Sequence, residues 1–366
     1  MANDYFGKRI ASADLDGYKV LRPEHWAYST IHIDEGSIAR NNRDYSGVLS
    51  PMYTTMGWIA DQHDPRFFEL LLRSPHLLEL YRKNARGTVN RRRSLPYSVF
   101  ASIAVDVPEV AEQRRIVEVV ESIDVTISAA NNEQLRASQV LQALREQLIL
   151  QAGYPSLPLG RLLLAIESGR SPITDGRPPK AGEPAVLKLS AIRTGAFNPA
   201  EAKALPPGFV MPPGSAVSIG DVLITRSNTP STVGDVCFVE DVPPGIYMSD
   251  LILRLRPDPT QIAAGYLANA LLTTDARRQI SESARGTSGS MRKISRELIR
   301  TYTIPCPDLS IQESVLKSLE SAAKVQAACA ALSRTLLGVR KVVAAELLTG
   351  AHRIPETYDE SLGEAV

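Results

Sequence analysis

Apolar residues recur at alternating steps of three and four between residues 108 and 151, and polar residues fill most positions between them. This series predicts one long amphipathic helix with a heptad-like apolar face. At about 1.5 Å per residue the helix spans roughly 60 Å, so it needs a second long helix alongside. The expected packing positions are Ile116, Val120, Ile123, Ile127, Ala130, Gln134, Ala137, Leu141, Leu144 and Leu148. The series is weakest in its middle, where two alanines and a glutamine replace large apolar residues.

The same pattern returns 199 positions later. Pro108 aligns with Pro307 and Gln113 with Gln312, and the two helices align without a gap. A repeat of this length is a duplicated half-protein rather than a solenoid unit. The second helix is therefore the expected partner of the first. Its own packing positions include Leu319, Leu336, Val343 and Leu347.

Short strand-like pieces, separated by Gly, Pro, Asn and Asp, precede both long helices. They occupy residues 1–66 in the first copy and begin at residue 154 in the second, and they predict two turn-rich β regions. A shorter helical pattern follows in each copy, at 65–82 and at 262–283. Pro75 is expected to interrupt the first of these helices because proline disrupts a helix interior.

The order of elements is thus duplicated, and strands expected at 103–107 and 301–304 lead into the prolines that open the long helices. The two copies are nevertheless unequal. Ser249 of the second copy corresponds to Ser50 of the first. In the second copy the β region has 96 residues up to this point (154–249), whereas only 49 residues precede Ser50 in the first. The stretch from 154 to about 197 has no counterpart. We expect the first β region to lack this opening segment, through a late annotated start or through decay.

Composition narrows the class of protein. The 366 residues are 44% hydrophobic and carry a net charge of +1, so any affinity for nucleic acid must come from local basic patches. Three cysteines without a CxxC pair fit a reduced cytoplasmic protein and argue against structural zinc or disulfides. No run approaches 18 apolar residues and the N-terminus has no signal-peptide pattern, so we expect a soluble, cytoplasmic chain.

No catalytic pattern is present in the sequence. It contains no GxGxxG, P-loop, HExxH or GxSxG motif, and its five histidines are scattered. A DNA methyltransferase would need a Gly-rich cofactor loop and an Asn/Asp-Pro-Pro-aromatic tetrapeptide, and neither occurs. We therefore expect no enzymatic activity, no metal site and no cofactor in this chain.

Two basic loops at the same offset favour contact with nucleic acid. Arg and Lys beside short hydroxyl and amide side chains form the composition that contacts phosphates. The candidates in the first loop are Arg86, Thr88, Asn90, Arg91, Arg92 and Arg93, and those in the second are Arg285, Thr287, Ser288, Ser290, Arg292 and Lys293. The alternative is a pair of ordinary solvated loops, which a duplicated patch in a nearly neutral chain disfavours.

Further candidates lie earlier in the second β region. Arg226 and Asn228, at the end of an apolar strand, have side chains suited to guanine and adenine edges respectively. They are equally consistent with polar residues that close a turn. Lys188 and Arg193 complete the set of expected DNA contacts.

The chain resembles the specificity subunits of type I restriction–modification systems. The resemblance is carried by SGVLSPMYTT at 46–55, GDVLITRSNTPSTVGDVCFV at 220–239 and GTSGSMRKIS at 286–295, and by the tandem order of β region and long helix. It implies an α+β fold with two β-rich target recognition domains, two long antiparallel helices and pseudo-two-fold symmetry. The implied parts are a first recognition domain (1–107), a first helix (108–153), a second recognition domain (154–306), a second helix (307–350) and a C-terminal tail (351–366).

The resemblance also implies partners. Each recognition domain would read one half of a split site on double-stranded DNA, and the helices would set the spacing and dock methyltransferase subunits. S-adenosylmethionine, ATP and magnesium would belong to those subunits and to the restriction subunits. The alternative is a helical scaffold, or a decayed or orphan specificity-like protein, that binds no DNA. A self-contained methyltransferase or nuclease is disfavoured by the missing motifs.

Overall fold

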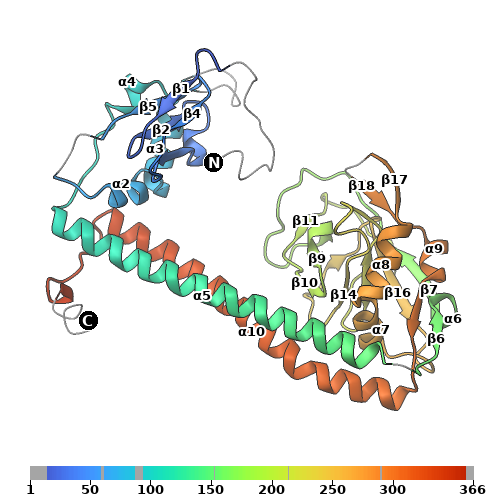
Figure 1. The fold of residues 1–366 in the computed structure, drawn as a ribbon. Coiled ribbons are helices and arrows are strands. Elements are labelled where there is room, and N and C mark those ends of the chain that lie inside the picture. Colours follow the sequence, from blue (N-terminus) through green and yellow to red (C-terminus); the bar gives the residue numbers. More distant parts are fainter. Residues whose placement is uncertain are drawn as a thin grey trace. The chain divides into compact units, whose positions relative to one another are not determined.

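The structure, a computed structural model, describes residues 15–58, 62–86, 94–151, 153–212, 214–288 and 291–359. The chain divides into two compact units (Figure 1). Unit 1 comprises Met1–Asn132 and Ala330–Val366, and unit 2 comprises Glu133–Cys329. Both long helices contribute one part to each unit.

The two long helices have the same length and the same offset as the sequence repeat. Helix α5 spans Val110–Ile149 and α10 spans Leu309–Leu348, 40 residues each. Neither contains proline, and only α10 contains a glycine, Gly338, so nothing in their interiors interrupts the backbone hydrogen bonds. Both are followed by a glycine in the left-handed region, Gly153 and Gly350, a common way to end a helix.

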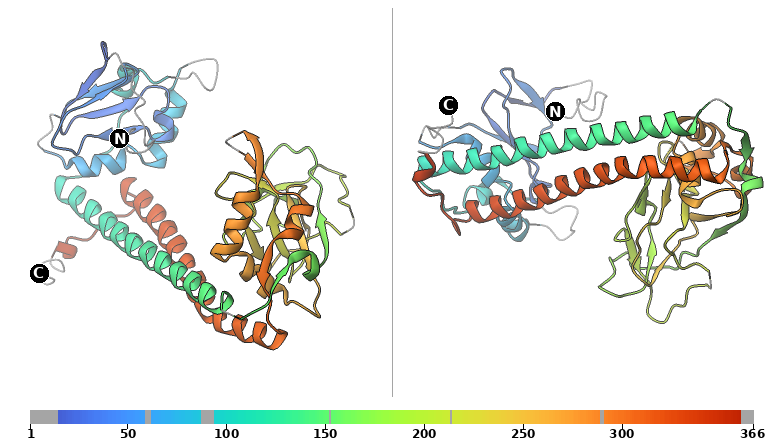
Figure 2. Two further views of the ribbon diagram at one scale, coloured as in Figure 1. Left: turned by 45° about the vertical axis from the view of Figure 1, so that its right-hand side comes forward. Right: turned by 90° about the horizontal axis from the view of Figure 1, so that it is seen from below.

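Within each unit the start of one long helix packs against the end of the other, as Figure 2 shows. In unit 1, Ile116 near the start of α5 shares a core with Leu347 at the end of α10. In unit 2, Ile149 at the end of α5 shares a core with Val315 and Leu319 near the start of α10. The pairing is therefore antiparallel in both units, and the predicted α+β class with two long antiparallel helices is confirmed.

Unit 1 is built on two small antiparallel sheets covered by short helices. One sheet pairs β1 with β4, and the other has the order β3-β2-β5. Its core contains Trp26, Tyr28, Phe67 and Tyr81 together with the first turns of α5. Its elements are β1 (Lys19–Leu21), β2 (Trp26–Ser29), η1 (Ile33–Glu35), β3 (Ile38–Arg40), β4 (Gly47–Leu49), β5 (Tyr53–Met56), α2 (Pro65–Leu71), α3 (Pro75–Asn84) and α4 (Tyr97–Phe100).

Unit 2 is larger, and its main sheet has the order β14-β12-β16-β7, antiparallel throughout. Smaller sheets of order β11-β8-β15, β13-β18-β17, β10-β9 and β19-β6 surround it. Its first elements are β6 (Ser156–Pro158), α6 (Leu159–Leu162), β7 (Leu163–Ser168), β8 (Ala185–Leu187), η3 (Leu189–Ala191), β9 (Ile192–Arg193), β10 (Ala196–Phe197) and β11 (Ala202–Ala204). The others are β12 (Val222–Thr225), β13 (Ser227–Asn228), β14 (Val236–Phe238), β15 (Ile246–Tyr247), β16 (Ile252–Pro257), α7 (Ala264–Leu271), α8 (Thr274–Ser283), β17 (Arg285–Ser288), β18 (Met291–Lys293), α9 (Arg296–Thr301) and β19 (Thr303–Pro305).

The repeat extends to the short helices. Helix α3 lies 199 positions before α8 with identical length, and α2 lies 199 positions before the start of α7. The pattern at 65–82 is interrupted before Pro75, as expected. The pattern at 262–283 is also two helices, because Thr273 begins α8 by accepting a hydrogen bond from the backbone of Ala276.

The strand expected at 103–107 does not form, and this expectation was wrong. Its counterpart β19 exists because it pairs with β6, which aligns Ile304 with Leu157. Strand β6 belongs to the segment for which the first copy has no equivalent. Among the described residues no strand pairs with 103–107, so this segment has no regular secondary structure.

Candidate nucleic-acid interface

Two separate sequence motifs come together in one three-stranded sheet of unit 2. Strand β13 pairs with β18, which aligns Asn228 with Arg292, and β18 pairs with β17, which aligns Lys293 with Arg285. Figure 1 shows β17 and β18 together at the edge of this unit. The predicted readout pair, Arg226 and Asn228, therefore lies beside the second basic loop, although about 60 residues separate them in the chain.

Backbone hydrogen bonds fix Arg226 between two neighbouring segments. Its N–H donates to the Leu251 carbonyl at 2.8 Å, and its carbonyl accepts from the Ile294 N–H at 2.9 Å. Ser227, the next residue, is fully buried, and its neighbour Asn228 accepts a hydrogen bond from the Thr229 N–H at 2.9 Å. The backbone of this turn is thus rigidly held, while the Arg226 side chain is exposed.

The sheet presents positive charge that remains available. Arg226, Arg285 and Lys293 are exposed, and no carboxylate of the described residues forms an ion pair with them. Arg292 is half-buried, and its guanidinium donates to the Ala284 carbonyl at 2.9 Å, so it also stabilises the sheet. An uncompensated cationic surface of this kind is suited to phosphate contacts.

One acid lies near this surface. Hydrogen bonds from its own backbone N–H and from Ser295 hold the pKa of Glu297 below its usual range, and the nearby Arg296 and Arg226 lower it further. Glu297 is therefore ionised at neutral pH, but it does not pair with Arg226. Arg296 itself donates to the Ser168 hydroxyl at 2.6 Å.

The other two predicted contacts of unit 2 lie outside this sheet. Lys188 lines a hollow of about 220 Å³ together with Ser171, Lys203 and Leu251, and its ammonium lies 3.8 Å from Glu201. Because the Leu251 carbonyl also binds the Arg226 backbone, the hollow adjoins the sheet. Arg193 is exposed on β9, which pairs with β10 and not with β13, β17 or β18.

The first basic loop is described only at its ends. Arg86 and Ser94 form an isolated antiparallel bridge, with both backbone hydrogen bonds at 2.9 Å. This bridge is the counterpart, 199 positions earlier, of the Arg285–Lys293 pair. The predicted contacts Thr88, Asn90, Arg91, Arg92 and Arg93 lie outside the described residues, as does Ser290. The strand β17 includes Thr287 and Ser288, whose side chains are not described.

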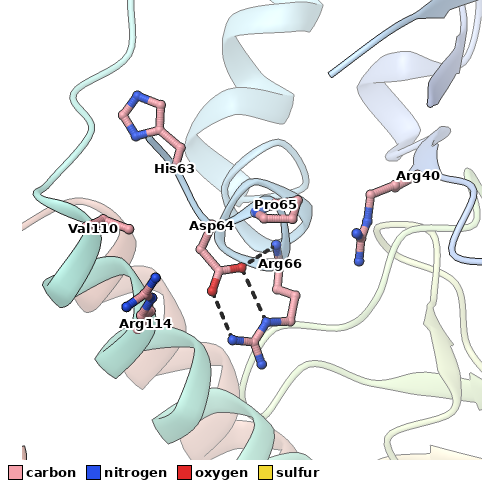
Figure 3. A pocket seen from close by; sticks show the side chains of 7 residues that line it. All are labelled: Arg40, His63, Asp64, Pro65, Arg66, Val110 and Arg114. Atoms are coloured by element: carbon pink, nitrogen blue, oxygen red, sulfur yellow. Dashed lines mark hydrogen bonds and ion pairs between the residues drawn. The ribbon is translucent and has the colours of Figure 1, made fainter. Parts of the chain in front are cut away.

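A hollow of about 410 Å³ in unit 1 is lined by basic side chains that the sequence did not suggest (Figure 3). Its charges are largely compensated. Arg40 pairs with Glu24 and Glu69, and Arg66 pairs with Asp64 at 2.9 Å. Burial alone would raise the pKa of Asp64, but hydrogen bonds from Arg66 keep it below its usual range. No local sequence pattern indicates this hollow, because its lining residues come from β3, α5 and the start of α2.

A buried glutamine joins each β region to the start of its long helix. Gln113, fully buried, accepts from the Asp64 N–H at 2.9 Å and donates to the Pro108 carbonyl at 2.7 Å, with His63 Nδ1 2.9 Å away. The second copy repeats these contacts. Gln312 accepts from the Ala263 N–H at 2.9 Å and donates to the Pro307 and Gln261 carbonyls at 2.7 and 2.9 Å. Gln113 and Gln312 are 199 positions apart and are thus identical at equivalent positions of the sequence repeat.

The expected helix-packing residues are all at least partly buried. Ile116 and Val120 are each 1% exposed, and Leu319 is 3% exposed. The less buried positions are Ile123, Leu141, Leu144, Leu148, Leu336 and Val343, while Ile127 and Leu347 are buried. In unit 1, Arg340 of α10 and Asp124 of α5 form a bidentate ion pair at 2.5 and 2.8 Å, which the apolar pattern did not indicate.

Within the described ranges no group of three or more His, Cys, Asp or Glu side chains is placed to hold a metal ion. In the same ranges no helix combines the length and apolar character that crossing a membrane requires.

These features resemble those of the specificity subunits of type I restriction–modification systems, and comparisons with known proteins give the same resemblance. No family model matches the chain. The chain is similar to the Type I restriction enzyme EcoEI specificity subunit of Escherichia coli. The two are 29% identical over 177 residues, which are 48% of this chain and 30% of that protein. The match thus spans less than a third of the relative's length.

The chain has the same fold as a solved structure from work on complex assembly and conformational transition of the type I restriction–modification system. It covers 93% of this chain and 85% of its own, with a TM-score of 0.54 at 19% identity. A crystal structure of the type I S subunit from M. genitalium covers 91% of this chain and 84% of its own, with a TM-score of 0.48 at 13% identity. The resemblance found in the sequence is confirmed. The relative is itself named a specificity subunit, the class that the sequence pattern resembles.

Proposed function

We propose that the chain recognises double-stranded DNA for a type I restriction–modification complex, through one target recognition domain in each unit. The observation that carries the proposal is the sheet β13-β18-β17. It gathers Arg226, Arg285 and Lys293, whose charges no described carboxylate neutralises, beside Asn228. Cations position a protein on phosphates, while a fork such as that of Arg226 suits a guanine edge.

The duplication supports a bipartite target. The Arg86–Ser94 bridge of unit 1 repeats the Arg285–Lys293 pair of unit 2. Two recognition surfaces on one protein match two half-sites on a duplex. In this proposal residues 1–107 and 154–306 are the recognition domains, residues 108–153 and 307–350 form the helices that set their separation, and residues 351–366 form a tail.

The helices offer surfaces for protein partners. Large apolar residues are exposed on them in both units, among them Val125 and Val342 in unit 1 and Leu135, Val140 and Val325 in unit 2. We propose that methyltransferase subunits dock there, and that restriction subunits join the complex in the cytoplasm. S-adenosylmethionine, ATP and magnesium then belong to those partners, and this chain supplies recognition alone.

Duplex binding by the complex with its methyltransferase tests the proposal. Arg226→Ala is expected to weaken binding to the specific site and to lower the slope of log affinity against log salt by about 1. The matched control is Arg278→Ala, because Arg278 is also exposed in unit 2 but lies on α8, where it pairs with Asp275. Equal salt slopes for wild type and for Arg226→Ala, Arg285→Ala and Lys293→Ala combined would reject DNA recognition by this sheet.

A helical scaffold without DNA affinity is the second candidate, and the exposed apolar residues of α5 and α10 favour it. Under that function the complex assembles normally, yet its duplex binding is the same with and without this chain. A methyltransferase that shows a bipartite methylation motif only in the presence of this chain excludes the scaffold.

A further inference from the structure

We infer that Thr30 and His32 are the base-reading positions of unit 1, equivalent to Arg226 and Asn228 of unit 2. The inference rests on the proposed function and names the residues that would set the specificity of the first half-site. No basic or amide motif marks them in the sequence. The constant offset of the repeat also points elsewhere, because it pairs Arg226 with Ala27, which lies inside β2 and is 7% exposed.

Strand register shows that the offset changes within the sheet. Strand β2 lies between β3 and β5, as β12 lies between β14 and β16. Trp26 faces Met56 across β2 and β5, and Val222 faces Leu255 across β12 and β16. Met56 and Leu255 are 199 positions apart, whereas Trp26 and Val222 are 196 apart. Residues that follow β2 therefore correspond to residues 196 positions later, and Thr30 takes the place of Arg226.

Hydrogen bonds beyond the strands support the same assignment. The Thr30 carbonyl accepts from the Leu95 N–H at 2.8 Å, and the Arg226 carbonyl accepts from the Ile294 N–H at 2.9 Å. Leu95 and Ile294 are 199 positions apart, and both are buried, at 0% and 1% exposure.

The other side of the turn repeats as well. The Thr30 hydroxyl lies 3.4 Å from the Met52 carbonyl, and the Arg226 N–H donates to the carbonyl of Leu251, which stands 199 positions after Met52. Thr30 thus lies between Met52 and Leu95, the counterparts of the residues Leu251 and Ile294 that hold Arg226. The equivalence follows from three-dimensional contacts and not from residue similarity.

The chemistry at the two places differs. Unit 2 presents a guanidinium at 226 and a carboxamide at 228, whereas unit 1 presents a hydroxyl at 30 and an imidazole at 32. The His32 side chain is 52% exposed, and its Nδ1 lies 3.4 Å from Glu35. An imidazole offers a donor and an acceptor nitrogen in an arrangement unlike the fork of arginine. The two half-sites are therefore expected to differ in sequence, with the guanine preference of Arg226 confined to one of them.

Long-read methylation sequencing of cells that express the complete complex tests the assignment. His32→Ala is expected to relax one base pair of one half-site by about tenfold or more and to leave the other half unchanged. Arg226→Ala is expected to relax the other half. The matched control, His76→Ala, removes an exposed imidazole from α3 of the same unit and should leave the motif as in wild type.

A gain-of-function variant guards against a folding defect. Thr30→Arg combined with His32→Asn places the side chains of unit 2 in unit 1 and is expected to introduce a guanine or adenine preference into the first half-site. If the methylation motif is unchanged in this double variant but altered by Arg226→Ala, the assignment of Thr30 and His32 is overturned. The proposed function is not affected by that result. If the Thr30/His32 variants and Arg226→Ala change the same half-site, the assignment of Thr30 and His32 is also overturned. If wild type shows no bipartite motif and Arg226→Ala has no effect, the proposed function itself fails.

Discussion

The two units share the same two long helices but differ at one strand, which is β16 in unit 2 and β5 in unit 1. In unit 2, β16 pairs with β12 on one side and with β7 on the other. In unit 1 the equivalent strand β5 pairs with β2 alone among the described strands. Unit 2 places Arg254 at the position where unit 1 has Thr55. Arg254 is 2% exposed, donates to Asp221 at 3.0 Å and forms an ion pair with Glu167, from β7, at 2.9 Å.

This difference teaches which parts of the repeat are coupled. A buried guanidinium is tolerated only when carboxylates and carbonyls satisfy it. Glu167 comes from the segment without a counterpart, and the Ala216 and Gly214 carbonyls complete the set. Without β7, an arginine at position 55 would lack the partner that β7 supplies, and a small hydroxyl residue stands there. The buried glutamines, by contrast, use backbone groups present in both copies, and both copies keep them.

The largest expected effect is the loss of the Arg254 network. Arg254→Met removes the nearest cation from Asp221, which is 3% exposed, and leaves it the more distant Arg256 at 3.6 Å and the Ser218 N–H. The loss of this buried partner is expected to cost unit 2 about 3 kcal/mol of stability. Circular dichroism measures the loss. Both tryptophans, Trp26 and Trp58, lie in unit 1, so its unfolding is followed separately by fluorescence. Thr55→Ala should change the free energy of unfolding of unit 1 by less than about 1 kcal/mol. Equal losses at both positions would show that β7 does not create the difference.

A charge on the packed face of α5 is expected to have the next largest effect. Ile123→Glu places a carboxylate at a half-buried position on the expected packing face of α5 and should cost roughly 2–3 kcal/mol, because a partly buried charge without a partner is poorly solvated. The control is Val125→Glu on the same helix, where the side chain is 70% exposed. Thermal unfolding followed by tryptophan fluorescence compares them, and an unchanged melting temperature for Ile123→Glu would remove Ile123 from the helix contact.

The buried glutamines are expected to stabilise the two units by similar amounts. Gln113→Ala and Gln312→Ala each leave buried backbone groups without a partner, at a cost of about 1–3 kcal/mol. Fluorescence should report the loss only for Gln113→Ala, while circular dichroism reports both. A much smaller effect of one variant would indicate that its unit fastens the long helix in another way.

The smallest expected effect is the pH dependence that Asp64 contributes to the stability of unit 1. The Asp64–Arg66 hydrogen bonds hold the pKa of Asp64 below its ordinary value of 3.8. Its contribution to stability is therefore complete above that value and is lost as the pH falls through the lower folded-state pKa. Unit 2 has Ala263 at the equivalent place. Acid unfolding followed by tryptophan fluorescence should lose part of its steepness in Asp64→Asn, and an identical acid profile would contradict this role.

Much of this architecture was accessible from local patterns. The heptad-like spacing and the repeat predicted both 40-residue helices, the interruption before Pro75 and the pairing of the two helices. The signal was strong because a long amphipathic helix needs a specific partner and the partner is its own copy. The basic loops were also apparent as motifs, but their proximity to Arg226 and Asn228 was not, since strand pairing between β13 and β18 joins segments far apart in the chain.

The sequence by itself determined the duplicated order of elements, the helix lengths and the local positive charge, because these depend on periodicity and composition within short windows. Only the tertiary structure decided which strands find partners, and so why 103–107 is not a strand while β19 is. It alone decided the register of β2, which moves the equivalence of Arg226 from Ala27 to Thr30. Insertions between strands shift a linear alignment, whereas hydrogen bonds to neighbouring segments preserve the position in space.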